Sequence, residues 1–227
     1  LTLPQFEISG GYVDGMGGIM SVAFAPHVKT EKRDEWESYA ELHQEWIAES
    51  LRLKQVHPGH RDPLHGTIQD HEHDRRLVDE PPEIPPIRNA IWRWDNGTRV
   101  TEESLPGQIF APLWQSSPAS AADVNVNLLS DKRVASLYNS MIATRQSVLS
   151  NDFPIEDLFD FLFDPDEKLL KTDPHAFLME PVYADFEENS EIVGFLLGVT
   201  TWINLFNRLI PEGANGIVCV VKDSCGG

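Results

Sequence analysis

Hydrophobic positions near the C-terminal end of the chain alternate between continuous runs and helical spacing. Residues 192–199 form a continuous apolar run of strand length, which predicts a buried strand. After it, apolar residues recur at the i, i+3, i+4, i+7 spacing of one helix face: Trp202, Leu205, Phe206 and Leu209. Polar residues between them argue against a membrane-spanning helix, which needs roughly twenty mostly apolar residues. A further apolar run at 216–221 completes a predicted strand–helix–strand pattern.

The N-terminal part of the chain predicts a strand and then one long helix. Residues 19–26 are mostly apolar and predict the strand. Thr30 is a candidate N-cap, acidic residues crowd the following turns, and helical spacing continues to residue 56. His43 lies in this stretch, where we expect a hydrogen-bonded core histidine rather than a catalytic base. The apolar face of the predicted helix consists of Trp36, Tyr39, Ala40, Trp46, Ile47 and Leu51.

The middle of the chain predicts an irregular connection and two strands. Residues 57–87 are rich in proline and histidine, and proline removes backbone donors and restricts the preceding residue, so regular structure is not expected there. Residues 90–100 predict a strand that enters a turn at Asn96 and Gly97. Residues 107–118 predict a second strand in this region.

The remaining pattern predicts another helix and another strand. Residues 127–150 show helical spacing, with Ser130 as the expected N-cap. Residues 175–186 predict a strand that pairs with residues 192–199. The chain is therefore expected to be an α+β domain with a long helix near its start, an antiparallel sheet, and helices between its strands.

Charge and motifs narrow the function classes. The chain has 36 acidic and 18 basic residues and a net charge of -18, which argues against nucleic acid or an anionic membrane surface as a partner. The sequence contains no G-x-S-x-G elbow, no Walker loop and no G-x-G-x-x-G motif. We therefore expect a non-catalytic binding module that needs no cofactor.

Five histidines stand close together in the proline-rich segment: His57, His60, His65, His71 and His73. They are weak candidates for metal ligands, because a proline-broken segment does not fix them on one face and no cysteine lies nearby. Asn96 begins an Asn-Gly-Thr sequon, a candidate glycosylation site that weakly favours an exported protein. The spacing of Cys219 and Cys225 leaves open whether Cys225 forms a disulfide, including one with a cysteine beyond residue 227.

Two glycines interrupt the predicted strand at residues 192–199. Gly194 and Gly198 are four residues apart, so they leave one face of the strand without side chains, while Phe195 and Leu197 point the other way. One interpretation is a low floor on which a ligand lies against the backbone. The other is a bulge or close packing of a neighbouring element.

Five segments in order resemble the CHASE domains, the extracytoplasmic sensor modules of receptor histidine kinases and nucleotide cyclases. These segments are residues 18–47, with an acid–aromatic pair at Glu35 and Trp36, followed by residues 109–114, 126–150, 177–183 and 192–210. The sequence is most similar to the diatom-type proteins that join such a sensor to an adenylate or guanylate cyclase domain. The choice between cyclase and histidine kinase output stays open.

The resemblance implies a PAS-like fold with a long N-terminal helix and a pocket for an unknown small-molecule ligand. It implies one CHASE-like region over residues 1–227, in which residues 17–200 form the membrane-distal PAS-like part and residues 201–227 begin a second, truncated part. It also implies an extracytoplasmic location, homodimerisation, and membrane helices and a catalytic domain outside this sequence.

The resemblance carries over several pocket positions. Asn127 stands where the cytokinin-binding members have an aspartate that anchors the base; an amide both donates and accepts, whereas a carboxylate only accepts, so cytokinin recognition is not implied. Phe195 stands where those members have a tyrosine. The complete set of expected ligand-binding residues is Phe110, Leu113, Asn127, Leu149, Met179, Phe195 and Gly198.

Two other hypotheses stay open on the sequence. The chain could be an interaction module that dimerises through the predicted helix at 30–56, which requires an apolar stripe left exposed in the monomer. It could instead be a secreted metal-binding domain built on the histidine segment. The sensor hypothesis requires a pocket between residues 177–183, residues 192–199 and the helix that follows Asp131.

Overall fold

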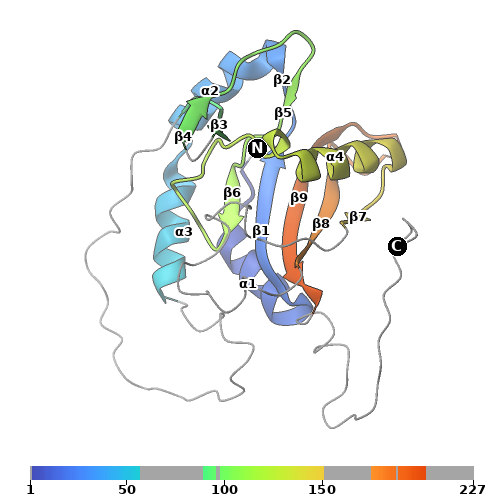
Figure 1. Ribbon diagram of the computed structural model, residues 1–227. Coiled ribbons are helices and arrows are strands. Elements are labelled where there is room, and N and C mark those ends of the chain that lie inside the picture. Colours follow the sequence, from blue (N-terminus) through green and yellow to red (C-terminus); the bar gives the residue numbers. More distant parts are fainter. Residues whose placement is uncertain (1, 57–88, 96–97, 151–174, 188, 203–227) are drawn as a thin grey trace, which may run out of the picture.

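The computed structural model describes residues 2–56, 89–95, 98–150, 175–187 and 189–202 (Figure 1). Within these ranges the fold is α+β. The helices are α1 (Phe6–Gly17), η1 (Thr30–Lys32), α2 (Arg33–Leu42), α3 (Glu45–Val56), η3 (Leu128–Ser130) and α4 (Lys132–Thr144), where η marks a 3-10 helix. The strands are β1 (Ile19–Pro26), β2 (Val28–Lys29), β3 (Trp92–Asp95), β4 (Thr98–Thr101), β5 (Ile109–Phe110), β6 (Gln115–Ser117), β7 (Val148–Leu149), β8 (His175–Tyr183) and β9 (Ile192–Thr201).

A five-stranded antiparallel sheet organises the described chain, with the strand order β6-β1-β9-β8-β7. β9 lies at its centre, pairs with β1 and β8, and is buried over most of its length. A strand buried on both faces is expected to have a continuous apolar sequence. This is why the apolar run at residues 192–199 predicted β9. Small pairs β2–β5 and β3–β4 lie outside this sheet.

The two faces of the sheet carry separate apolar clusters. On β1, Ala23 and Ala25 belong to the first cluster, which α4 covers, while Val22 and Phe24 belong to the second. The second cluster lies against α1, α2 and α3 and includes Phe6, Trp36, Trp46, Ile47 and Trp114. Figure 1 shows α4 and α3 on different sides of the central strands. The alternation of strand side chains therefore divides the interior into two cores.

Several predicted elements are confirmed. β1 has the predicted bounds, and β8 pairs antiparallel with β9 from His175↔Thr201 to Tyr183↔Ile192. β3 and β4 pair antiparallel up to Asp95↔Thr98, and the predicted turn residues Asn96 and Gly97 lie outside the described residues. Of the predicted helix at 202–209 only Trp202 lies within the described residues, and the predicted strand at 216–221 lies outside them.

The predicted long N-terminal helix is wrong. η1 ends at Lys32 and is followed directly by α2, which ends at Leu42. A separate helix, α3, begins at Glu45. At the break, His43 has a non-helical backbone (φ -125°, ψ 55°), its Nδ1 lies 2.9 Å from the Tyr39 carbonyl oxygen, and its ring stacks on Tyr39 at 4.1 Å. The side chain thus competes for a carbonyl that a continuing helix would use. His43 is exposed rather than in the core, which corrects that expectation too.

Two helix termini also differ from prediction. The N-cap of α4 is Asp131, not Ser130, because the Asp131 carboxylate accepts from the N–H groups of Arg133 and Val134. α4 ends at Thr144 instead of continuing to residue 150, since Arg145 adopts the left-handed conformation (φ 55°). Thr30 does not act as an N-cap side chain; its hydroxyl donates to the carbonyls of Leu105 and Gln108.

Arg33 joins α2 to the segment at 91–104. Its guanidinium is buried and pairs with Glu37 at 2.7 Å, donates to the Glu102 carbonyl at 2.6 Å and to Ser104 Oγ at 2.8 Å. Glu37 in turn accepts from the N–H of Ile91 at 2.9 Å. The planar guanidinium of arginine can donate to several acceptors at once, and these bonds hold α2 against this segment.

None of the helices in the described part of the chain has the length and apolarity needed to cross a bilayer.

Candidate functional site

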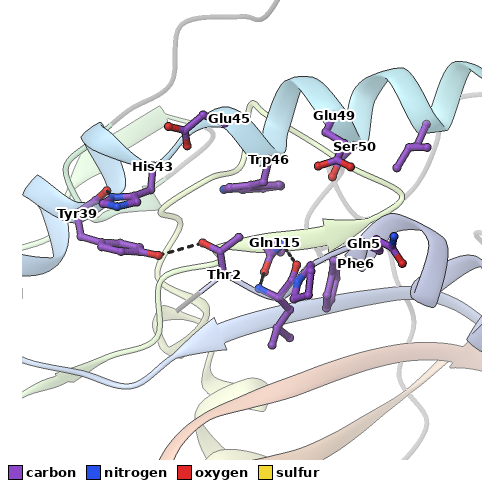
Figure 2. Close-up of a pocket in the computed structure, with 13 residues that line it drawn as sticks. Thr2, Gln5, Phe6, Tyr39, His43, Glu45, Trp46, Glu49, Ser50 and Gln115 are labelled. Atoms are coloured by element: carbon purple, nitrogen blue, oxygen red, sulfur yellow. Dashed lines mark hydrogen bonds between the residues drawn. The ribbon is translucent and has the colours of Figure 1, made fainter.

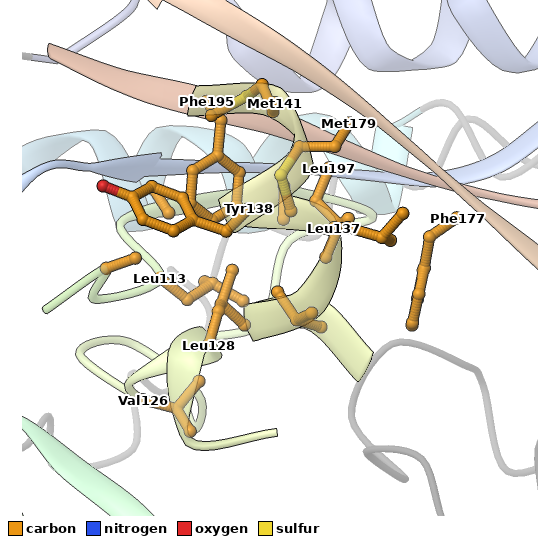
Figure 3. Close-up of a cluster of buried hydrophobic side chains, with 14 of the residues drawn as sticks. Leu113, Val126, Leu128, Leu137, Tyr138, Met141, Phe177, Met179, Phe195 and Leu197 are labelled. Atoms are coloured by element: carbon orange, nitrogen blue, oxygen red, sulfur yellow. The ribbon is translucent and has the colours of Figure 1, made fainter. Parts of the chain in front are cut away.

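Three of the expected ligand-binding residues lie in the first apolar cluster, between α4 and the sheet (Figure 3). Leu113, Met179 and Phe195 are almost completely buried there. Two other expected residues lie elsewhere. Phe110 belongs to the second cluster, and Leu149 is 48 % exposed on the edge strand β7. The structure therefore brings part of the predicted set together and separates the rest.

The space between α4 and the sheet is occupied by side chains. Tyr138 and Met141 project from α4 and meet Phe195, Leu197 and Met179 from β9 and β8 (Figure 3). The rings of Tyr138 and Phe195 lie 5.9 Å apart. The described side chains here form one buried apolar core cluster.

A polar bridge closes one edge of this cluster. His27 Nδ1 lies 3.1 Å from the carbonyl oxygen of Ile192, and His27 Nε2 forms a hydrogen bond with the Tyr138 hydroxyl. A carbonyl only accepts, so Nδ1 donates to Ile192, while the second hydrogen bond joins Nε2 and the Tyr138 hydroxyl. Burial raises the pKa of Tyr138 to about 12, which keeps this hydroxyl protonated.

Asn127 is buried beside the cluster and its side chain is engaged with the backbone. Its Oδ1 accepts from the N–H of Ala111 at 3.0 Å, and its own N–H donates to the Trp92 carbonyl at 2.7 Å. Its carbonyl accepts from Ser130 Oγ at 2.7 Å. In this structure Asn127 thus holds three chain segments together.

The two glycines of β9 face the second cluster and accommodate β1. A Cβ built on Gly194 would lie 2.6 Å from the carbonyl oxygen of Ala25, and one on Gly198 would lie 3.1 Å from Ile19 Cγ2. Gly198 and Phe195 therefore lie on opposite faces of β9 and cannot line one pocket. Close packing of a neighbouring strand accounts for both glycines.

A cavity of about 390 Å³ lies on the other side of the molecule (Figure 2). It is lined by residues 2–6, by Tyr39 and His43 at the end of α2, by the first half of α3, and by Gln115 of β6. Sequence reasoning did not find it, because its walls come from segments far apart in the chain and residues 2–6 showed no periodicity.

Hydrogen bonds fix the wall formed by residues 2–6. The Leu3 N–H donates to Gln115 Oε1 at 2.7 Å, and Gln115 Nε2 donates to the Leu3 carbonyl at 2.9 Å. Thr2 Oγ1 lies 3.0 Å from the Tyr39 hydroxyl and accepts from Trp114 Nε1 at 3.0 Å. These contacts hold the segment along the cavity, and dashed lines in Figure 2 mark those made with Gln115 and Tyr39.

Trp46 and two carboxylates give the cavity its chemical character. The Trp46 side chain projects from α3 toward Thr2 and Gln115 (Figure 2). Its side chain is buried, and its indole Nε1 has no hydrogen-bond partner among the described residues. Glu45 and Glu49 also line the cavity and are exposed, and no lysine or arginine contributes to its described lining.

The candidate metal ligands and the sequon are not placed. His57, His60, His65, His71 and His73 lie outside the described residues, as do Asn96, Cys219 and Cys225. Among the residues that are described, no group of three or more histidine, cysteine or acidic side chains is arranged to hold a metal ion.

Neither a family model nor a curated protein matches this chain. Function is therefore inferred from the fold, the two clusters and the cavity.

Proposed function

We propose that this chain is a PAS-like, CHASE-type sensor domain of a membrane receptor, and that it is itself non-catalytic. The observation that supports this proposal is the order of strands in the central sheet. The pocket expected between α4, β8 and β9 does not support it, because side chains fill that space. Counted along the chain, its strands β1, β6, β7, β8 and β9 are first to fifth, so the order β6-β1-β9-β8-β7 reads 2-1-5-4-3. This is the strand order of PAS-type sensor sheets, with the third strand at one edge and the fifth at the centre.

The position of α4 agrees with the same fold type. α4 lies in the chain between β6 and β7, the second and third strands of the sheet, and packs on the sheet through Tyr138 and Met141. The ordered resemblance of residues 18–47, 109–114, 126–150, 177–183 and 192–210 to CHASE modules is independent support. A likeness of fold alone would not carry function, so the proposal rests on both together.

The proposal includes the biological setting. The sensor region spans residues 1–227, with residues 17–200 as its membrane-distal part and residues 201–227 as the start of a second part. It lies on the extracytoplasmic side and is attached to membrane helices and a nucleotide cyclase domain outside this sequence. Binding of a small ligand shifts the helices that enter the membrane and thereby changes cyclase activity.

The same proposal describes the receptor as a homodimer. The apolar face of α2 and α3 is not the expected contact, because Trp36, Ala40, Trp46 and Ile47 are buried inside the chain. On these helices Leu42, which is 71 % exposed, is the large apolar side chain that reaches solvent within the described residues. An interaction module that works only through this helix face therefore receives no support.

Native mass spectrometry of the chain, purified from a eukaryotic host, tests the sensor role. We expect a retained, non-metal adduct that is released when the protein is unfolded, which gives the mass of the ligand. As the control, the same chain refolded in ligand-free buffer should show the bare mass and regain the adduct from host extract. A stable dimer that never carries an adduct would contradict the sensor role and favour an interaction module.

The membrane part of the proposal needs the full-length protein. Membranes that contain it should change their rate of cyclic nucleotide synthesis when the recovered ligand is added. An unchanged rate, with the ligand bound, would overturn the coupling to a cyclase while leaving ligand binding intact.

A further inference from the structure

Phe186 is the most exposed large apolar side chain in the described part of the chain. It lies in the turn between β8 and β9 and its side chain is fully exposed, whereas phenylalanine is among the residues most often buried. A single exposed apolar residue needs no explanation in itself, so the surroundings of Phe186 decide whether it marks a contact surface.

The turn that carries Phe186 is held by hydrogen bonds on both sides of it. The Asp185 N–H donates to Ser190 Oγ at 2.9 Å, and the Asp185 carboxylate accepts from the Glu187 N–H at 2.8 Å. The Ser190 N–H donates to the Glu187 carbonyl at 3.0 Å. Because the backbone of this turn is already ordered, a contact made by Phe186 costs little further conformational entropy.

The C-terminal end of α4 lies beside this turn. Arg145 donates from Nη2 to the Ser190 carbonyl, and its guanidinium carbon lies 5.2 Å from the centre of the Tyr183 ring. The Tyr183 hydroxyl donates back to the Arg145 carbonyl at 2.6 Å. Ile142 precedes Arg145 by three residues, so it lies on the same side of α4, and it is 37 % exposed. The turn and this side of α4 are therefore neighbours on the surface, and each exposes one large apolar side chain.

The two halves of this surface carry opposite charge. Residues 132–150, which contain α4 and β7, include the basic residues Lys132, Arg133 and Arg145 and no acidic residue, although the net charge of the chain is -18. Residues 185–191 contain four acidic residues and no basic one. A two-fold contact that places the turn of one copy on α4 of the other brings opposite charges together twice. A second copy of this chain therefore fits the whole surface.

We propose that the β8–β9 turn and the C-terminal half of α4 form the interface of a homodimer, in which Phe186 of each copy packs against Ile142 of the other. This interface rests on the homodimer of the proposed function and gives it a surface other than the apolar face of α2 and α3, which is buried inside the chain. The contact is isologous, since the same surface acts in both copies.

Sedimentation equilibrium of the whole chain, over a range of concentrations, measures the dimer. We expect a concentration-dependent dimer whose dissociation constant rises about tenfold or more in Phe186→Ser, because both contacts lose their aromatic anchor. Leu42→Ser removes another exposed apolar side chain, at the end of α2, and should leave the dissociation constant unchanged. A wild-type chain that stays monomeric at every concentration, or a Phe186→Ser chain that dimerises like the wild type, would overturn the proposal.

Mixing two variants tests the pairing of Phe186 with Ile142. Phe186→Ser and Ile142→Asp each break both contacts of their own homodimer, whereas a mixed dimer keeps one contact, between Phe186 of the second variant and Ile142 of the first. We therefore expect the mixture to associate more strongly than either variant alone. Ile142→Ser repeats the test without a negative charge in the last turn of α4, where it would destabilise the helix. If neither mixture associates more strongly than its separate variants, the proposed pairing is wrong.

The interface and the sensor role can fail separately. If Phe186→Ser is monomeric but the wild-type dimer never carries a ligand adduct, the interface stands and the sensor role fails. If the wild-type chain carries an adduct and its dimer survives both Phe186→Ser and Ile142→Asp, the sensor role and the homodimer stand, and this interface is overturned.

Discussion

The side-chain oxygen of Asn127 accepts a hydrogen bond from the backbone N–H of Ala111 at 3.0 Å. Both residues are buried, and neighbouring backbone bonds join the same two segments, from Leu128 N–H to the Ala111 carbonyl and from Leu113 N–H to the Val126 carbonyl. The position that resemblance assigns to ligand recognition thus has a structural partner. A ligand that used this oxygen would have to share it with Ala111, since a carbonyl oxygen has two lone pairs.

Replacing Asn127 with alanine should lower the free energy of unfolding by about 1–3 kcal/mol, because it leaves the Ala111 N–H buried without an acceptor. Urea denaturation followed by tryptophan fluorescence measures this change. Asn139→Ala, at an exposed position of α4, is the control and should stay within about 0.5 kcal/mol of the wild type. A variant of Asn127 as stable as the wild type would show that the side chain does not hold this segment.

The glycines of β9 should differ in their tolerance of alanine. At Gly194 the added Cβ meets backbone, the Ala25 carbonyl oxygen at 2.6 Å, so β1 and β9 must separate, and we expect a loss of about 1–3 kcal/mol in the free energy of unfolding. At Gly198 it meets the Ile19 side chain at 3.1 Å, which can move, and the loss should be under ~1 kcal/mol. Midpoints of urea unfolding compare the two variants, and the reverse order would contradict close packing as the reason for these glycines.

Strands were predicted well where burial leaves a continuous apolar run. β1 and β9 are buried over most of their length, so local composition alone identifies them. The break between α2 and α3 has no such signal: the apolar spacing continues through it, and only the contact of His43 with Tyr39 and its carbonyl ends the helix. A local side-chain contact overrides periodicity at this point.

The helix α1 was not predicted, because it depends on a contact between distant parts of the chain. Its sequence, FEISGGYVDGMG, is rich in glycine, which has a low helix propensity. A Cβ added at Gly10 would clash with the Ser117 side chain, so glycine allows α1 to lie close against β6. Residues 10 and 117 are far apart in the chain, and no local pattern reveals this contact. The cavity escaped prediction for the same reason, since Gln115 and Leu3 meet only in the folded chain.

Asp123 should make the protein less stable as pH rises. Burial raises the pKa of its carboxyl group to about 6, an effect that outweighs the hydrogen bond from Ser120 and the charge of Arg99. In the unfolded chain an aspartate has a pKa of about 3.9, so the folded state binds more protons than the unfolded state between pH ~4 and ~6. The free energy of unfolding therefore falls as pH rises through this window.

The change Asp123→Asn removes this penalty while keeping an oxygen that accepts from Ser120. At pH 7 we expect the variant to be more stable by roughly 1–3 kcal/mol, on the scale of about 1.4 kcal/mol for each unit of pKa. At pH ~4 the two proteins should converge. Glu103→Gln, which removes one exposed charge, is the matched control and should show no such convergence. Unfolding in guanidinium chloride at both pH values measures the stability of each protein. A stability difference that is constant with pH would exclude Asp123 as its source.

Asp131 should give the opposite pH dependence. Its partial burial by itself favours the neutral acid, but the side-chain and backbone hydrogen bonds of Arg133, its charge, and the Val134 N–H hold the pKa of Asp131 below the ordinary value. The carboxylate therefore stabilises the folded state above pH ~4, and this contribution is lost as pH falls through the lowered folded pKa. At pH 7, Asp131→Ala should cost about 0.5–2 kcal/mol, the usual range for an N-cap.

The same variant should approach the wild type as pH falls through the lowered folded-state pKa of Asp131, because the wild-type carboxylate is then becoming protonated. Asp131→Ser separates the cap from the charge: serine still accepts from the first N–H groups of α4, so its loss at pH 7 should be smaller than that of alanine, and both losses should shrink as the wild-type carboxylate is protonated. Unfolding midpoints in urea at pH 7 and at the lowest pH at which the fold persists measure both effects. If alanine and serine at position 131 lost the same free energy at pH 7, the capping bonds seen at Arg133 and Val134 would contribute nothing to the stability of α4.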